Sequence, residues 1–509
     1  MKRKITLFIT SVLLLTGVTS CNDWLDVEQD TEKKADEMFD DYNGFKGALM
    51  GCYDDLAGTS LYGTNLTMSH VDALAGLWYI DNTRSDLSST LSECYALSEH
   101  NYGNSYAEDA VKKIYGAFYN TVLEANLVLQ GCRENGGNIG DEQVRALIEG
   151  EAYAIRALCQ FDILRLFGQI PHNPTQQKSL PYSFTTSLDE MPAYYDWQDY
   201  VALVKNDIDS ALILMKDNDP LFEYTYHELN TLTVSDTQTE LRDDFLTNRR
   251  IRMNYWAVKA LQARFYLYIG EKQKAYAAAM DVIGARTTGG KSVVELSSMK
   301  DYGGGGTKYN SESECLFGVW VQDLYDVSVP LLAGGPRSKS NIDLNSNLIL
   351  TSSLYESCFL EARTAVDIRY LNLWSKTTPL GSTTVYPSIR KYYIDKENED
   401  SDVQGIVPVL RLSEMYLIAV ETAETLNEAN TLYTEYMESK NVALHTPFAS
   451  ADDIKPELMR EYRREFFAEG QLFYFYKRHQ ETKLWSQDKD VSETDYCLPL
   501  PNTEFNPAK

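Results

Sequence analysis

Two irregular segments of the chain carry aromatic and polar side chains that belong to no helical stripe. The residues concerned are Trp78, Tyr79, Asn82, Arg84, Trp320, Asp323 and Tyr325. Trp and Tyr rings offer apolar faces on which the C–H faces of sugar rings can lie, while Asn, Asp and Arg side chains can hydrogen-bond to hydroxyls. These residues are therefore the candidate ligand contacts. An alternative stays open for two of them, because Trp320 can equally cap the core at the end of a strand and Trp78 can equally be structural.

The other groups that could do chemistry form no catalytic pattern. None of the six histidines belongs to an H-E-x-x-H sequence, and no Gly-x-Ser-x-Gly elbow occurs, which disfavours a zinc hydrolase and an α/β-hydrolase. The glycine run 303–306 lacks the Lys-Ser/Thr of a phosphate loop. The acidic run 395–402 could hold Ca²⁺ but lacks the spacing of an EF-hand, so a solvated loop is favoured.

Carboxylates are too numerous for their sequence positions to reveal a glycosidase pair, because such a pair is recognised by its separation in space. We therefore expect a binding protein without catalytic residues, cofactor or metal. A surface glycoside hydrolase remains the alternative from a different class.

The N-terminus reads as a secretory signal over residues 1–20. Lys2, Arg3 and Lys4 precede an apolar run from Ile5 to Leu15 that is too short to cross a bilayer. The small residue Ser20 stands directly before Cys21, and this arrangement resembles the lipobox of bacterial lipoproteins, with Val18 as a mild departure. We expect Cys21 to carry the lipid, and the acyl chains to anchor the mature chain in a membrane, since each buried CH₂ contributes about 0.8 kcal/mol.

The 509-residue chain has 74 acidic against 47 basic residues and a formal charge of -27. This charge would repel phosphate backbones, so no nucleic-acid partner is expected. Its eight cysteines form no C-x-x-C pair, which leaves zinc-ribbon and thioredoxin functions without support. Once Cys21 is set aside, seven remain and at least one is unpaired; Cys159 stands among apolar residues and reads as a core residue.

Helical periodicity covers most of the chain. Apolar stripes or helix-like composition predict helices over 39–56, 110–129, 142–167, 197–215, 253–283 and 411–440. A further stripe joins Leu458, Tyr462, Phe466 and Phe473, and the arginines and glutamates between Arg460 and Glu469 are expected to form ion pairs or meet solvent. Trp197 and Trp256 lie inside helical patterns and are expected in the core. Residues 314–322 read as a strand, whereas 61–106 shows no periodicity.

Several of these helices have the pattern of a helical hairpin. Ala263, Tyr266, Gly270 and Ala275 follow the small, bulky, turn and small order of a tetratricopeptide unit, in which small residues let two helices approach. Similar pairs are predicted over 110–167 and 411–440, and 197–215 is expected against 255–269. Insertions separate the pairs, so no regular solenoid is expected.

The C-terminal region resembles the SusD/RagB family. The resemblance lies in Arg-x-x-Glu-x-Tyr-Leu-Ile-Ala from Arg411, in Arg-Arg-Glu-Phe-x-x-Glu-Gly-Gln-x-Phe from Arg463, and in Leu-Pro-x-Pro from Leu498. A second similarity is the Arg-Ala…Phe-Gly-x-x-Pro pattern from Arg156 to Pro171. The resemblance implies a mostly α fold, SusD-like, with tetratricopeptide-type hairpins, irregular loops and a few short β-strands.

The same resemblance implies a function. Members are surface lipoproteins that capture nutrients, usually glycans, for a SusC-like TonB-dependent outer-membrane transporter, against which the hairpins pack. We expect a lipid-anchored outer-membrane protein facing the cell exterior, with capture of peptides or another nutrient as the alternative. The expected organisation is a lipoprotein signal over 1–20, a SusD-like N-terminal region over 21–250 and a SusD/RagB C-terminal region over 251–509, packed together as one body.

Overall fold

The structure, a computed structural model, describes residues 37–231, 243–302, 309–333, 342–359, 366–379, 383–393, 405–443, 445–485 and 490–505. Cys21, the glycine run 303–306 and the acidic run 395–402 lie outside these residues. The predictions for the lipid anchor, the phosphate loop and the calcium loop therefore concern parts of the chain that the structure does not describe.

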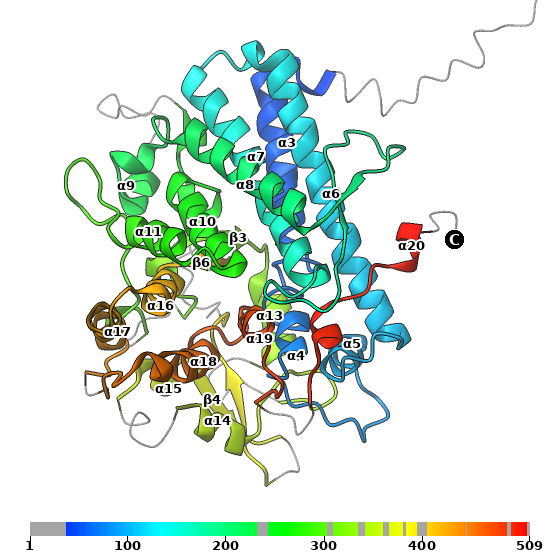
Figure 1. The fold of residues 1–509 in the computed structure, drawn as a ribbon, viewed down its shortest axis with the longest axis vertical. Coiled ribbons are helices and arrows are strands. Elements are labelled where there is room, and N and C mark those ends of the chain that lie inside the picture. The colour runs from blue at the N-terminus through cyan, green and yellow to red at the C-terminus, as the bar shows by residue number, and fades with distance from the viewer. Residues whose placement is uncertain are drawn as a thin grey trace, which may run out of the picture.

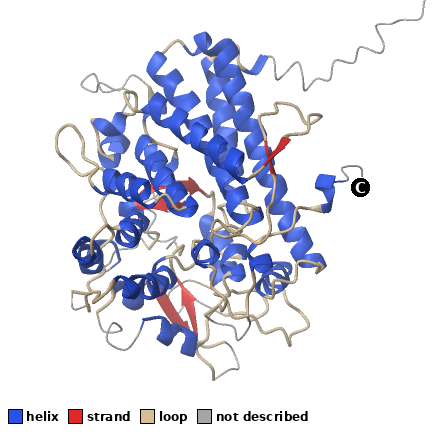
Figure 2. Ribbon diagram, in the orientation of Figure 1, coloured by secondary structure: helices blue, strands red, loops and turns tan. Residues whose placement is uncertain are grey.

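Helices dominate the described residues, and the predicted mostly α fold is confirmed (Figure 2). In chain order the helices are α3 (Tyr42–Ala57), α4 (His70–Leu74), α5 (Ser89–Ser98), α6 (Ser105–Asn135), α7 (Glu142–Phe167), α8 (Trp197–Met215), α9 (Tyr226–Thr231), α10 (Tyr255–Ile269), α11 (Lys272–Ile283), α12 (Met299–Tyr302), α13 (Leu324–Leu332), α14 (Ser352–Phe359), α15 (Ile368–Asn372), α16 (Leu412–Thr422), α17 (Leu426–Ser439), α18 (Ile454–Glu465), α19 (Leu472–His479) and α20 (Asn502–Phe505). Among the residues described, no helix combines the length and apolar character needed to cross a membrane.

The predicted hairpins form a row of neighbouring helices. Helix α3 packs on α6, α6 on α7, α7 on α8, α8 on α10, α10 on α11, α11 on α16 and α16 on α17. In Figure 1 this row runs from the long helices at the top, through the green α10 and α11, to the orange α16 and α17 at the left. The segments between hairpins gather on the other side of the row, where α4, α5, α13 and α14 lie.

Local signals explain where these helices begin and end. Helix α7 covers the predicted range 142–167: the Asp141 side chain accepts hydrogen bonds from two backbone N–H groups of its first turn, and Gly168 follows its last residue. Helix α10 ends at Ile269 and is followed by Gly270, whose φ of 86° lies in the left-handed region. A Cβ at Gly270 would come within 2.5 Å of the His172 ring, so the turn between α10 and α11 requires glycine.

Three two-stranded antiparallel sheets accompany the helices: β1 (Leu180–Tyr182) with β2 (Ala193–Tyr195), β3 (Cys315–Trp320) with β6 (Ile406–Arg411), and β4 (Trp374–Thr377) with β5 (Tyr386–Ile389). The strand predicted over 314–322 is confirmed as β3. Strand β6 leads directly into α16, so Arg411 is the last residue of a strand rather than the first of a helix.

The C-terminal stripe predicted from Leu458 to Phe473 is interrupted. Helix α18 ends at Glu465 and α19 starts at Leu472, with Ala468 (φ 61°) and Gly470 (φ 68°) in the turn between them. The oxygens of the buried Asp72 carboxyl group accept hydrogen bonds from the N–H groups of Ala468 at 2.6 Å and Gly470 at 3.1 Å. This tertiary contact with α4 stabilises a left-handed turn that helical periodicity does not predict.

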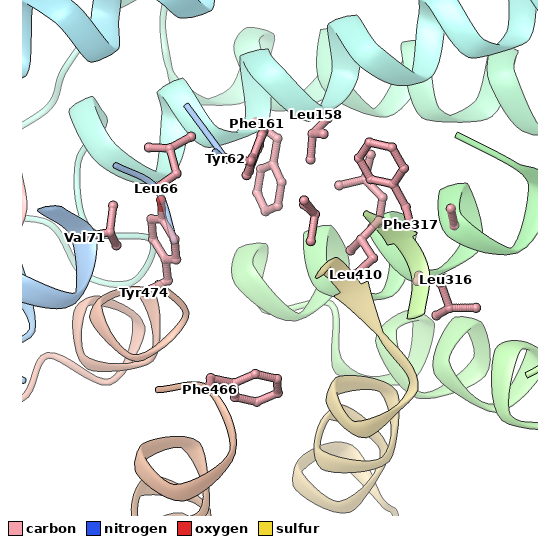
Figure 3. Packing of buried hydrophobic residues seen from close by; sticks show 14 of the residues in the cluster. Tyr62, Leu66, Val71, Leu158, Phe161, Leu316, Phe317, Leu410, Phe466 and Tyr474 are labelled. Carbon is pink, nitrogen blue, oxygen red and sulfur yellow. The ribbon is translucent and has the colours of Figure 1, made fainter. Parts of the chain in front are cut away.

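One buried cluster joins side chains from distant parts of the sequence. Figure 3 shows Phe161 of α7, Phe317 of β3 and Leu410 of β6 converging, with Tyr474 of α19 beside Leu66. Trp256 is buried, as predicted, and Trp197 is half-buried against the cluster. The seven cysteines of the described residues, Cys159 among them, are buried and unpaired.

The arginines and glutamates of the C-terminal stretch do form ion pairs, as expected, but most are buried rather than solvated. Arg411 donates to Glu465 at 2.8 Å and to Glu469 at 2.7 Å, and Arg369 donates to Glu465 at 2.8 Å. Burial disfavours a charged Glu465, but Lys440, Arg411 and Arg369 more than offset it and hold the Glu465 pKa well below its usual range.

The hairpin register predicts that leucine substitutions at two alanines of α11 differ in their effect on stability. Ala275 is fully buried, like Ala263 on α10, whereas Ala277 is exposed on the same helix. Ala275→Leu should lower the free energy of unfolding by about 1–3 kcal/mol through overpacking. Ala277→Leu should change it by less than about 0.5 kcal/mol. Urea titration of both variants checks the register, and equal effects would contradict it.

Candidate ligand-binding site

The segment after α4 is attached to a second, distant segment of the chain. The Tyr79 N–H donates to the Ile349 carbonyl at 2.9 Å, and the Tyr79 ring stacks on Tyr386 of β5 with centroids 6.2 Å apart. The structure therefore places Tyr79, half-buried, against a small apolar cluster around Ile349. Only part of its ring is left to meet a ligand.

Asn82 and Arg84 are exposed in the loop that follows. Arg84 donates to Asp81 at 3.3 Å and to the Asn345 side chain at 3.1 Å, and Asn82 donates to the Tyr95 hydroxyl at 2.6 Å. Both side chains thus shape the loop and also present polar atoms to solvent. The predicted irregular segment 61–106 contains α4 and α5, which its sequence did not indicate.

Trp78 points into the protein. Trp78 is only 5% exposed, and its ring contacts the Phe467 ring edge-on, with the ring centroids 5.5 Å apart. Of the two alternatives for Trp78, this environment matches the structural one. Trp78 therefore fills the core and offers no open stacking face.

The second predicted group lies where β3 meets α13. Trp320 is the last residue of β3 and is 40% exposed, while Asp323 takes a left-handed φ of 56° directly before α13. Tyr325, half-buried, has its ring 6.0 Å from that of Tyr393. Trp320 is thus the member of the predicted set with the most accessible aromatic ring.

A polar pocket lies between the elements that carry the two predicted groups. Its volume is about 440 Å³, within the usual range of ligand sites. It is lined by Thr59, Ser60, Thr64, Asn65, His70, Ser88, Ser89, Thr90, Glu93, Lys113, Val327, Pro330, Leu331 and Ser346. The first residues of α5 form one wall and α13 forms another, so the loop after Tyr79 and the helix after Asp323 both lead into this polar pocket.

An ionic chain crosses the base of the polar pocket. His70 Nε2 lies 2.9 Å from Glu93, and Lys113 Nζ lies 2.8 Å from the other Glu93 oxygen. Burial would raise the Glu93 pKa, but the hydrogen bonds from His70 and Lys113 outweigh it and lower the pKa below its ordinary value. Glu93 is therefore held as a carboxylate that accepts hydrogen bonds.

The order of Ser69, His70 and Glu93 superficially matches a catalytic triad, because Ser69 Oγ lies 2.8 Å from His70 Nδ1. Ser69 is fully buried, however, and is not among the residues of the pocket wall. Its hydroxyl cannot attack a molecule in the pocket. What the wall offers is a set of hydroxyl, amide and charged groups that can exchange hydrogen bonds with a polyhydroxylated ligand.

Most of the residues that line the polar pocket could not be predicted from the sequence. The run from Thr59 to Asn65 and the triplet Ser88–Thr90 are rich in hydroxyl and amide side chains, which is a weak signal shared by many loops. Nothing in the sequence connects Lys113 on α6 with Glu93 on α5. In the part of the chain described, no group of three or more His, Cys, Asp or Glu side chains is arranged to hold a metal ion.

Comparisons with known proteins agree with the predicted resemblance. The model of the SusD family matches residues 368–498, while no curated protein matches the chain significantly. A SusD superfamily protein from Bacteroides thetaiotaomicron has a similar structure, with a TM-score of 0.67 and 21% identity over 92% of this chain and 98% of that one.

Two further structures carry descriptions of a ligand. Surface glycan-binding protein A from Bacteroides uniformis is similar with a TM-score of 0.64 and 14% identity, over 92% of this chain and 98% of that one. A laminarin-binding SusD-like protein has a TM-score of 0.59 and 16% identity, over 92% and 97% of the two chains. The SusD-like fold and the resemblance to the SusD/RagB family are confirmed.

Proposed function

With a SusD-like fold as the premise, we propose that this chain is a cell-surface lipoprotein that binds a glycan and delivers it to a SusC-like TonB-dependent transporter of the outer membrane. The observation that carries the binding role is the polar pocket between α5 and α13, lined largely by hydroxyl and amide groups. Sugars present many hydroxyls, and the groups on this wall can form hydrogen bonds with them. The descriptions of two similar structures, one glycan-binding and one laminarin-binding, support the same ligand class.

The proposed contacts combine the pocket with exposed groups of the two predicted segments, although none of the seven predicted residues is among those that line the pocket. Trp320 would provide a stacking face, and Asn82, Arg84 and Asp323 would provide polar contacts, while Tyr79 and Tyr325 would shape the surface between them. Stacking and hydrogen bonding at separate places fix both the plane and the orientation of a sugar ring.

Hydrolysis is a weaker proposal than binding. A glycosidase needs two carboxyl groups across the scissile bond, one of them protonated. Of the described residues that line the polar pocket, Glu93 alone carries a carboxyl group, and its ion pairs lower its pKa. The described lining of the polar pocket therefore offers no protonated carboxyl group, so this pocket supports binding better than hydrolysis.

A glycan array tests the proposal. The purified chain without its first 21 residues should bind a defined set of glycans, and incubation with these glycans should release no new reducing ends. Binding to peptides in place of glycans would favour capture of another nutrient, and turnover would favour the hydrolase. Either result would refute the proposed function.

Trp320 offers a direct test of the site. Trp320→Ala should weaken binding of the glycan found on the array by about 1–3 kcal/mol, the contribution of one stacked ring at other recognition sites, with unchanged thermal unfolding. Trp197 is the matched control, because it is half-buried in the helical row with its ring 6.3 Å from Tyr268. Trp197→Ala should lower the melting temperature and leave affinity unchanged. Calorimetry and thermal melting of both variants decide whether Trp320 belongs to the site.

Cys21 offers a test of the anchor. Cys21→Ala should abolish labelling by a clickable fatty acid and leave the protein soluble in the periplasm, because the acylated thiol is lost. Membrane fractionation and fluorescence of labelled protein measure both effects. Cys497→Ala, which removes a buried cysteine of the folded body, is the control and should retain the label. Continued acylation of Cys21→Ala would exclude the proposed anchor.

A further inference from the structure

A second cavity adjoins the polar pocket. Its volume is about 740 Å³, and it lies between the end of α3 and the first half of α6. Its walls are Asp54, Asp55, Gly58, Thr59, Ser60, Asp109, Lys112, Lys113, Gly116, Ala117 and Asn120. We name it the acidic compartment.

The acidic compartment and the polar pocket share three wall residues: Thr59, Ser60 and Lys113. Lys113 lies at their junction, with its ammonium group held 2.8 Å from Glu93 of the polar pocket. Because the same side chains border both spaces, the polar pocket and the acidic compartment adjoin each other, and we refer to the two together as the groove.

The charge of the acidic compartment is negative. Its lining carries three carboxyl groups, those of Asp54, Asp55 and Asp109, against the two ammonium groups of Lys112 and Lys113, and Lys113 is already paired with Glu93. The nearby Glu124 carboxyl group is affected by the same negative charges: burial, together with the charges of Asp55 and Asp54, raises the Glu124 pKa to about 7. An anionic ligand would meet repulsion in this part of the groove.

We propose that the ligand is an uncharged oligosaccharide chain, longer than a single sugar unit, which occupies the polar pocket and the acidic compartment together. This inference rests on the proposed glycan-binding function and adds the charge and the extended form of the ligand. A single sugar unit fills only one part of the groove, so affinity should rise with chain length until both parts are occupied. Uronate-containing and sulfated chains should be excluded.

Gly116 provides a way to close the acidic compartment without disturbing the fold. It lies inside α6 on the wall of this compartment, and a Cβ added there would meet no atom within 4 Å. Glycine is also an unfavourable residue within a helix, so a side chain at this exposed position should not destabilise α6. Gly116→Phe should therefore fill space that the ligand needs.

Gly47 is the matched control. It is an exposed glycine inside α3, a Cβ there would also meet no atom within 4 Å, and it lines neither part of the groove. Gly47→Phe introduces the same ring in the same helical setting. Any effect seen with Gly116→Phe but not with Gly47→Phe then arises from the groove.

The experiment measures dissociation constants by calorimetry for laminari-, malto-, xylo- and manno-oligosaccharides of increasing length, and for oligogalacturonates as the acidic series. For the neutral series that binds, wild type and Gly47→Phe should gain affinity with length. Gly116→Phe should bind the longest chains at least about tenfold more weakly than wild type, a change of about 1.4 kcal/mol, and the shortest binding member unchanged.

Three results would overturn the inference. Tight binding of oligogalacturonate would refute the uncharged ligand, and affinity that is independent of length, or unaffected by Gly116→Phe, would refute the extended one. In these cases the proposed glycan-binding function would stand. Absence of binding to every series would refute the proposed function and this inference together.

Discussion

Replacing Arg411 by methionine is expected to lower the free energy of unfolding by about 3–5 kcal/mol, as removal of one partner from a buried ion pair does. The Arg411 guanidinium is 1% exposed and donates to Glu465 at 2.8 Å and to Glu469 at 2.7 Å, and it also pairs with Glu314. Methionine fills a similar volume without charge. The three carboxylates, which are at most 5% exposed, would then share the remaining cations in the protein interior.

The matched control for this prediction is Arg460 on α18. Arg460 donates to Glu457 at 2.6 Å, but its side chain is 40% exposed. Arg460→Met should therefore cost less than about 1 kcal/mol, because solvent screens the pair. Urea unfolding of both variants at pH 7 gives the comparison. Equal losses would show that the buried cluster contributes no more than a surface pair.

Glu421→Gln is expected to lower the free energy of unfolding by about 3 kcal/mol at pH 7, and this loss should shrink in acid. The Glu421 carboxylate accepts a bidentate pair of hydrogen bonds from Arg478, with one N–O distance of 2.7 Å. Burial disfavours its charge, but Arg478 and His479 outweigh burial and hold the Glu421 pKa well below its usual range. The carboxylate therefore stabilises the folded state.

The direction of the pH effect follows from this lowered pKa. The stabilisation is complete above the pKa of the unfolded chain, about 4.3 for glutamate, and is lost as the pH falls toward the folded pKa. Below about pH 4.5 the difference in the free energy of unfolding between wild type and Glu421→Gln should shrink by up to about 1.4 kcal/mol per pH unit. Urea unfolding from pH 7 to pH 3 measures the difference.

Comparison of the two proteins cancels the titration of groups distant from Glu421, whereas His479, whose Nε2 lies 3.3 Å from Glu421, titrates differently once the carboxylate is replaced. Burial raises the pKa of Asp72 and of Glu124, which favours folding in acid, but both groups are present in wild type and variant. Glu271→Gln serves as a control, because the Glu271 side chain is 50% exposed and 3.1 Å from Lys274. Its effect should stay below about 1 kcal/mol at every pH. A constant loss for Glu421→Gln across the range would contradict the lowered pKa.

The helices were largely predictable because their signals are local. Helical periodicity, Gly168 and Pro171 predict the range 142–167, and an amphipathic pattern, which Asp196 caps in the structure, predicts the range 197–215. The tetratricopeptide order of small and bulky residues predicts the turn at Gly270. Each of these signals lies within a few residues of the feature that it predicts.

The candidate site was only partly predictable. The sequence directed attention to the loops around Tyr79 and Trp320, and α5 and α13, which follow these loops, form two walls of the polar pocket. It could not tell that Trp78 packs on Phe467 while its neighbour Tyr79 reaches the surface. In a loop, no period assigns alternate residues to the core or to solvent.

By itself, the sequence determined the mostly α architecture, the main hairpins, a strand within 314–322 and the resemblance to the SusD/RagB family. Tertiary structure alone decided that Arg411 and Glu465 pair away from water, that Asp72 fixes the turn at Ala468, and that Glu93 meets Lys113 beside a run of hydroxyls. The reason is the range of the forces concerned. Helix propensity, capping and periodicity act between residues a few positions apart, whereas burial and convergence of polar groups depend on which elements pack together.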